Sequence, residues 1–278
     1  FVYFLLLIFE GALRKWLLPG LATPLLLARD PIVIAIYFLA LQQNRFLFNN
    51  WILGAVLLAV ASAFTAMTAG HGNPYVTAYG LRANFLHLPL IFVMWSTLSR
   101  NDLRRYARWM LYFSILMTLL VGVQFLSPPT AWVNIGVGGI GTSTFSGAAG
   151  YHRVSGSFSF TNGLVAFYSL AFACWAALVL DKKRTPSWLL VAAGIAILLA
   201  IPLSISRGLL VSVSIIAIGG AFVLPRLPGW GNTIPRLVIF VGIAVFGSSQ
   251  LPIFDEATSA FEQRWKSAAK AEGGATDK

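Results

Sequence analysis

Two arginines, each at the start of a long apolar stretch, have the residue type and position for binding an anion. Arg153 lies in the polar segment Tyr151–Asn162, which reads YHRVSGSFSFTN, and Arg207 lies in Ser204–Gly208, which reads SISRG. An arginine guanidinium group matches the oxygen atoms of a phosphate, and a helix start adds free N–H groups and a partial positive charge. We therefore predict that Arg153 and Arg207 together bind a diphosphate.

Other polar residues are weaker candidates for the same site. Arg82 stands at the start of another apolar run and could add a third guanidinium group, although snorkelling to a membrane interface is a competing explanation. His152 precedes Arg153 and could act as a general base, but a loop histidine near lipid headgroups explains it equally well. The catalytic residue is therefore unassigned, and no metal or cofactor is expected. Polar residues that support the two arginine motifs are Ser157, Asn162 and Ser206.

The composition places these motifs in a membrane protein. Hydrophobic residues make up 58% of the 278 residues and charged residues only 10%, against about 25% charged in a soluble domain. Apolar runs near the ~20 residues that span a bilayer recur along the chain, and they are too long and continuous for barrel strands. The predicted fold class is an all-α, polytopic bundle of transmembrane helices. The net charge of +11 lies in short loops, so we expect membrane lipids and anionic ligands as partners rather than nucleic acid.

The apolar runs predict about eight complete spans after a partial first helix over Phe1–Phe9. Glu10–Ala28 is interpreted as an interfacial or re-entrant connection in which Glu10 pairs with Arg14 at helical spacing, and Ser99–Arg108 as a basic loop. Two parts are expected, namely a transmembrane domain over 1–252 with a periplasmic Gly-rich loop over 127–160, and the start of a periplasmic loop with an amphipathic helix over 253–278. The chain begins in mid-run without Met, so we expect a fragment. The expected spans are Arg29–Leu41, Trp51–Ala69, Arg82–Leu98, Trp109–Leu126, Leu164–Leu180, Trp188–Leu203, Arg207–Leu224 and Leu237–Leu251.

Basic residues in short loops predict which side of the membrane is cytoplasmic. Alternation of the spans puts the dense clusters on one face, and the positive-inside rule makes that face cytoplasmic. These clusters are Arg45, the group Arg100–Arg108, Lys182–Arg184, and Arg226 with Arg236. Arg153 and Arg207 then fall on the outer face, where basic residues are less common than on the cytoplasmic face. An anionic ligand would account for their position there.

The two arginine motifs occur in a recognisable order. Arg153 is followed by Gly156-Ser157-Phe158 and by Thr161-Asn162 just before a helix, and Ser206-Arg207-Gly208 opens a later helix. This order resembles the O-antigen ligase and O-antigen polymerase superfamily over roughly Trp109–Lys278. The segment Glu10–Asp30 also looks like one found in environmental members of that group, without a role that we can attach to it.

The resemblance implies an integral-membrane glycosyltransferase of the bacterial inner membrane with its active side in the periplasm. Such enzymes pass a glycan from undecaprenyl diphosphate to the lipid A core in ligases, or to a growing lipid-linked glycan in polymerases, during lipopolysaccharide and polysaccharide biosynthesis. They use no nucleotide sugar or metal, and the resemblance implies that Arg153 and Arg207 bind the diphosphate. Ligases also use a histidine on the periplasmic loop after these helices, but the stretch Pro252–Lys278 contains none.

A transporter or flippase of lipid-linked glycans is the alternative function. Transporters often contain inverted repeats with helices broken at mid-membrane. No convincing internal repeat is found here, and the charges lie at helix ends, so we favour the glycosyltransferase. Whether the chain is a ligase or a polymerase stays open.

Overall fold

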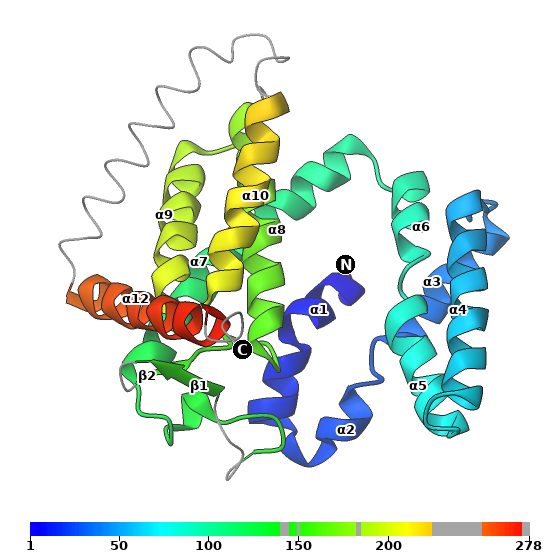
Figure 1. Ribbon diagram of the computed structural model, residues 1–278. Helices are drawn as coiled ribbons and strands as arrows, with labels where there is room; N and C mark the ends of the chain where they lie inside the picture. The colour runs from blue at the N-terminus through cyan, green and yellow to red at the C-terminus, as the bar shows by residue number, and fades with distance from the viewer. Residues whose placement is uncertain (140–144, 149–150, 182–184, 224–251, 274–278) are drawn as a thin grey trace. The chain divides into compact units, whose positions relative to one another are not determined.

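The computed structural model describes residues 1–139, 145–148, 151–181, 185–223 and 252–273 (Figure 1). The described chain is α-helical apart from one short antiparallel ribbon, in which β1 (Phe145–Ala148) pairs with β2 (Tyr151–Arg153). The helices in chain order are α1 (Val2–Ala12), α2 (Ala22–Leu25), α3 (Asp30–Gln42), α4 (Asn50–Thr68), α5 (Pro74–Phe85), α6 (Leu90–Thr97), α7 (Arg100–Leu126), α8 (Thr161–Leu180), α9 (Ser187–Leu203), α10 (Arg207–Val223) and α12 (Pro252–Gly273). Short helical turns also occur at Leu13–Leu17, Pro19–Leu21 and Trp132–Asn134.

The predicted helical class is confirmed, but the predicted number of about eight spans is not. Among the described residues, five helical stretches are long and apolar enough to cross a membrane, and α9 and the stretch Arg207–Gly220 of α10 are shorter apolar helices. The predicted span Leu237–Leu251 lies outside the described residues. The five long stretches are Pro19–Gln42, Asn50–Thr68, Pro74–Thr97, Arg100–Leu126 and Thr161–Leu180.

The chain divides into two compact units. The first contains residues 1–7 and 23–103, and the second contains residues 8–22 and 104–278. The predicted division near residue 252 separates a membrane domain from a periplasmic loop and stays a prediction.

Local capping corrects two of the predicted boundaries. Ser99 and Asp102 form a reciprocal capping box, in which the Ser99 backbone N–H donates to the Asp102 carboxylate and the Asp102 N–H donates to Ser99 Oγ. The basic stretch that was expected to be a loop is therefore the first turns of α7. Similarly, Asn73 caps α5 by accepting from the Tyr75 N–H at 2.9 Å, and Pro74 occupies the first helical turn. This helix begins before Arg82, the residue predicted to start the span.

A polar cluster connects three segments of the first unit. The Arg82 guanidinium group pairs with the Asp30 carboxylate and donates to the Leu26 carbonyl at 2.7 Å. His87 Nε2 lies 3.5 Å from the same carboxylate, and His87 Nδ1 lies 3.1 Å from the Tyr3 hydroxyl. The charge of Arg82 is thus compensated by Asp30 within this unit, which explains an arginine in an apolar helix better than snorkelling does.

The Asp30–Arg82 pair makes the first unit sensitive to the loss of one partner. We expect Asp30→Asn to lower the free energy of unfolding by roughly 3–5 kcal/mol, because it leaves the Arg82 charge uncompensated in apolar surroundings. Thermal unfolding of the purified protein in detergent measures this change. The double variant Asp30→Asn/Arg82→Gln should recover much of the loss. The exposed pair Glu262–Lys266 on α12 serves as the control, and a Glu262→Gln change as large as that of Asp30→Asn would contradict the expectation.

Candidate functional site

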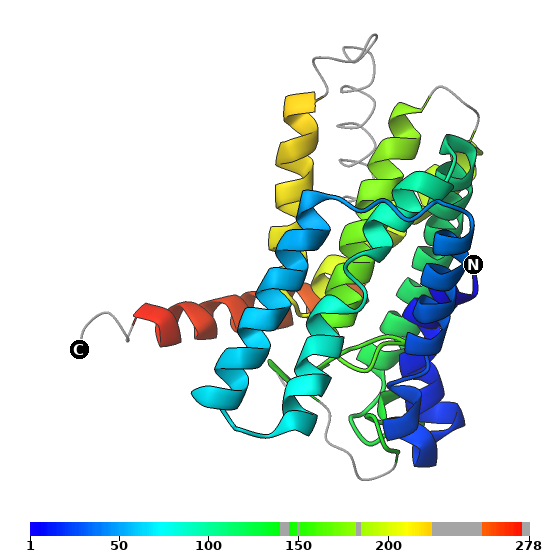
Figure 2. The same cartoon turned by 90° about the vertical axis from the view of Figure 1, so that its right-hand side faces the viewer.

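The second unit places the starts of α8 and α10 at the same end of a group of helices. Helix α8 contacts both α9 and α10, and the three run side by side (Figures 1 and 2). Helix α12 runs crosswise to α10 in both views and contacts α9 and β1. Two buried alanines of α12, Ala257 and Ala260, allow this close packing. The arrangement forms a pocket where α8 and α10 begin.

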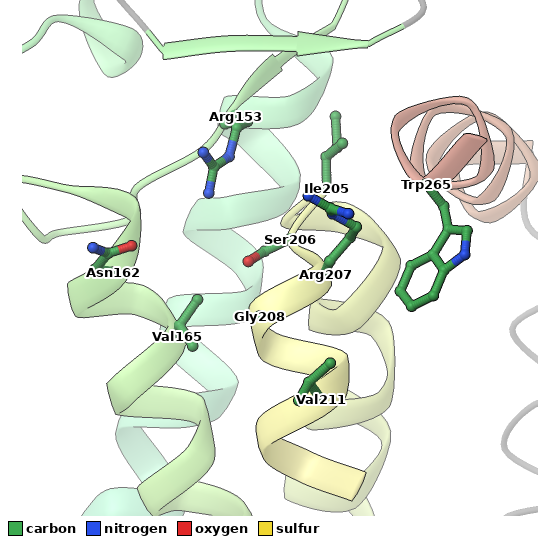
Figure 3. A pocket seen from close by; sticks show the side chains of 9 residues that line it. All are labelled: Arg153, Asn162, Val165, Ile205, Ser206, Arg207, Gly208, Val211 and Trp265. Carbon is green, nitrogen blue, oxygen red and sulfur yellow. The ribbon is translucent and has the colours of Figure 1, made fainter. Parts of the chain in front are cut away.

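Both Arg153 and Arg207 line this pocket, although they are 54 positions apart in the sequence (Figure 3). Its volume is about 480 Å³. Arg153 enters from the end of β2 and Arg207 from the first residue of α10. The structure thus brings together the two arginines that the sequence motifs single out. The lining residues are Arg153, Asn162, Val165, Ile205, Ser206, Arg207, Gly208, Val211 and Trp265.

The walls of the pocket differ in chemistry along its length. The guanidinium groups are accompanied by Asn162 and Ser206, and none of the nine described residues that line the pocket is acidic. One turn further along α8 and α10, Val165 and Val211 line the pocket with apolar side chains (Figure 3). Trp265 of α12 contributes an aromatic ring that is 45% exposed. The pocket therefore offers positive, aromatic and apolar surfaces to one ligand.

A strained turn positions Arg207. Helix α9 ends just after Pro202, and Ile205 has a φ of +47°, a conformation that is uncommon for a β-branched residue. Ile205 is 1% exposed and its neighbour Ser206 is also buried, so packing holds the turn in this conformation. Strain of this kind is found at functional sites, where it fixes a side chain in a required direction. Here it places the start of α10 at the pocket.

His152, the weak candidate for a general base, does not line the pocket. Successive side chains of a strand point to opposite faces, so His152 points away from the face that Arg153 occupies. It is buried, and Nε2 has no hydrogen-bond partner among the described residues. Burial lowers the pKa of His152, which favours the neutral imidazole. Its role as a base stays a prediction that would need a rearrangement of the ribbon.

Ser157 supports the site from behind rather than lining it. Its side chain is 2% exposed and donates to the Ile8 carbonyl at 2.6 Å. The neighbouring residue, Gly156, is held by Gln124 of α7, which accepts from the Gly156 N–H at 2.8 Å and donates to its carbonyl at 3.2 Å. These contacts fix the backbone that connects Arg153 to the start of α8. Sequence inspection misses Gln124 because a glutamine within a long apolar helix gives no indication of its partner.

Arg82 is placed by the structure in the first unit, where it pairs with Asp30, and it is not among the lining residues. The expected Glu10–Arg14 pair is confirmed, with Arg14 Nη1 3.5 Å from Glu10 Oε1. Trp265 is a further lining residue that the motifs did not indicate. Among the described residues, no three His, Cys, Asp or Glu side chains are close enough to hold a metal ion.

Substitution of Gly156 tests the backbone conformation between β2 and α8. Its φ is +57°, and a Cβ atom there would lie 2.7 Å from Met117 Sδ and 2.9 Å from Leu164 Cδ1. We expect Gly156→Ala to lower the free energy of unfolding by roughly 1–3 kcal/mol through overpacking and backbone strain. The matched control is Gly219→Ala in α10, where a Cβ meets nothing within 4 Å and helix propensity should improve. Equal thermal stability of the two variants in detergent would contradict the described loop conformation.

Comparisons with known proteins add no family to this geometry. No protein-family model matches the chain, and neither a curated protein nor a solved structure matches it.

Proposed function

We propose that this protein is a membrane glycosyltransferase of the O-antigen ligase or polymerase type, which takes a glycan from undecaprenyl diphosphate on the periplasmic face of the bacterial inner membrane. The observation that carries the proposal is the pocket in which Arg153 and Arg207 meet at the starts of α8 and α10. Two guanidinium groups and two helix starts are an arrangement suited to the charge and oxygen atoms of a diphosphate.

The other walls of the pocket suit the remaining parts of such a substrate. Val165 and Val211 continue from the arginines along the apolar helices, where a prenyl chain would leave towards the hydrocarbon. Trp265 presents an aromatic face beside Arg207, where a sugar ring attached to the diphosphate could stack (Figure 3). A soluble nucleotide sugar would need no apolar track of this kind, which is why a lipid-linked donor fits better.

The chemistry of glycan transfer explains why two arginines are useful. An acceptor hydroxyl attacks the anomeric carbon, the bond from that carbon to the diphosphate oxygen breaks, and the oxygen keeps the electron pair. Negative charge therefore develops on the leaving diphosphate, and fixed cations stabilise it in a site with little water. The acceptor proton needs a general base. None of the nine described lining residues is a histidine or a carboxylate, so a neighbouring segment would have to supply this base.

The proposed orientation in the membrane is inferred from the end of the second unit that lies opposite the pocket. Near the start of α7, Arg104 pairs with Asp181, the residue that follows α8, so these two segments share one end. The positive-inside bias makes the end with the basic α7 residues cytoplasmic. The pocket lies where α8 starts, which is the other end of that helix and hence the periplasmic side.

Substitution of either arginine tests the proposal. In proteoliposomes that contain the full-length protein, a lipid-linked oligosaccharide and candidate acceptors, we expect Arg153→Ala and Arg207→Ala each to slow glycan transfer by about 10²-fold or more. Lysine at either position should keep part of the activity, because it retains the charge but loses the two-pronged geometry. The control is Arg105→Gln, which removes an exposed arginine of α7 that does not line the pocket.

Each outcome of this assay separates the possible functions. Full transfer by both alanine variants would rule out the arginine site. Movement of the lipid between leaflets without any new glycosidic bond would instead support the transporter or flippase. Transfer to a lipid A core acceptor would identify a ligase, and lengthening of the lipid-linked glycan would identify a polymerase.

A further inference from the structure

The segment between Arg153 and α8 is held by a part of the chain that is about 140 residues away in sequence. Lys15, in the helical turn Leu13–Leu17, is 2% exposed, and its ammonium group donates to the Gly156 carbonyl at 2.6 Å and to Ser155 Oγ at 3.1 Å. A buried ammonium group is costly unless such acceptors replace water. Burial also lowers the pKa of Lys15 to about 7. Ser155 is only two positions after Arg153 in the chain, so these contacts hold the backbone that leads to a pocket residue.

Arg14 holds the other end of the same segment. Its guanidinium group donates to Ser159 Oγ at 3.0 Å and to the Ala22 carbonyl at 2.7 Å, and it pairs with Glu10. Ser159 lies just before α8, whose second residue, Asn162, lines the pocket. The two basic side chains therefore hold the segment near both of its ends.

Gly11 allows the N-terminal helix to approach this closely. A Cβ atom at Gly11 would overlap the backbone of Ser157 and Ser159. At the same place the Ser157 hydroxyl donates to the Ile8 carbonyl. Helix α1 thus packs directly on the backbone of the segment, with no side chain between them.

We propose that Arg14 and Lys15 are positioning residues, which clamp Ser155–Ser159 so that Arg153 and Asn162 are held in the geometry for binding a diphosphate. The proposal rests on the proposed function for its ligand, and it assigns a role to the N-terminal motif EGALRKW. Neither residue lines the pocket, so both act through the backbone that they hold. Preorganisation of this kind matters because a site that is displaced by about 1 Å loses much of its binding and rate.

Lys15→Met is the informative variant. Methionine fills a similar volume, and the Gly156 carbonyl keeps its hydrogen bond from Gln124, so the fold should persist. For the purified protein in nanodiscs, we expect faster hydrogen exchange at the amides of residues 155–159 with exchange in α9 unchanged. The dissociation constant for undecaprenyl diphosphate should rise about tenfold, because displacement of Arg153 would weaken its charge-assisted hydrogen bonds to the diphosphate. Lys15→Arg, which keeps a cation and donors, should restore most of the affinity.

The matched control is Lys266→Met, which removes an exposed lysine of α12. This variant should leave both the exchange and the affinity unchanged. Exchange at 155–159 that is equal in Lys15→Met and the unmodified protein would overturn the clamp, whatever the affinity. Faster exchange with unchanged affinity would overturn the positioning role. If the unmodified protein does not bind undecaprenyl diphosphate, the proposed function fails, and the exchange comparison still decides whether the clamp exists.

Discussion

A charge beside hydrocarbon needs a partner, and this constraint accounts for most of the polar structure in the chain. Basic side chains pair with carboxylates or donate to backbone carbonyls, and several of these contacts join segments that are distant in sequence. Among the described residues, Arg82 pairs with Asp30 and Arg104 with Asp181 across distant segments, whereas Arg14 pairs with Glu10 one helical turn away. Lys15 meets the Gly156 carbonyl instead. Arg153 and Arg207 both line a pocket that is large enough for a ligand.

The pocket depends on backbone conformations that would not persist without support. Gly156 and Ile205 both have positive φ angles; Gly156 lies three positions after Arg153, and Ile205 lies two positions before Arg207. The Gly156 backbone is held by Gln124 and Lys15, and Ile205 is held by complete burial. The stability of the bundle thus maintains the two local conformations that aim the polar groups at one place. A preformed site of this kind suits the proposed glycan transfer, which depends on stabilising a leaving group.

Local and distant polar contacts explain features of the structure that the sequence did not indicate. The basic stretch Ser99–Arg108 was predicted to be a loop, but the Ser99–Asp102 capping box starts α7 there. Arg82, the weak candidate for the diphosphate site, pairs with Asp30, a partner that is 52 residues away and not visible in the sequence; its part in a diphosphate site stays a prediction. Ser157 was predicted to support the arginine motif, and its hydroxyl donates to the Ile8 carbonyl.

The sequence by itself determined the helical class, most helix boundaries and the two arginine motifs, because apolar run length and capping residues act over a few residues of chain. Only the tertiary structure decided that Arg153 and Arg207 share one pocket, that Trp265 joins them, and that Lys15 holds the connecting segment from 141 residues away. Helix periodicity states which face of a helix is apolar, but in a chain that is apolar on nearly every face it does not state which helices meet. Close contacts through glycine and buried polar partners make that choice, and they join residues that are distant in sequence.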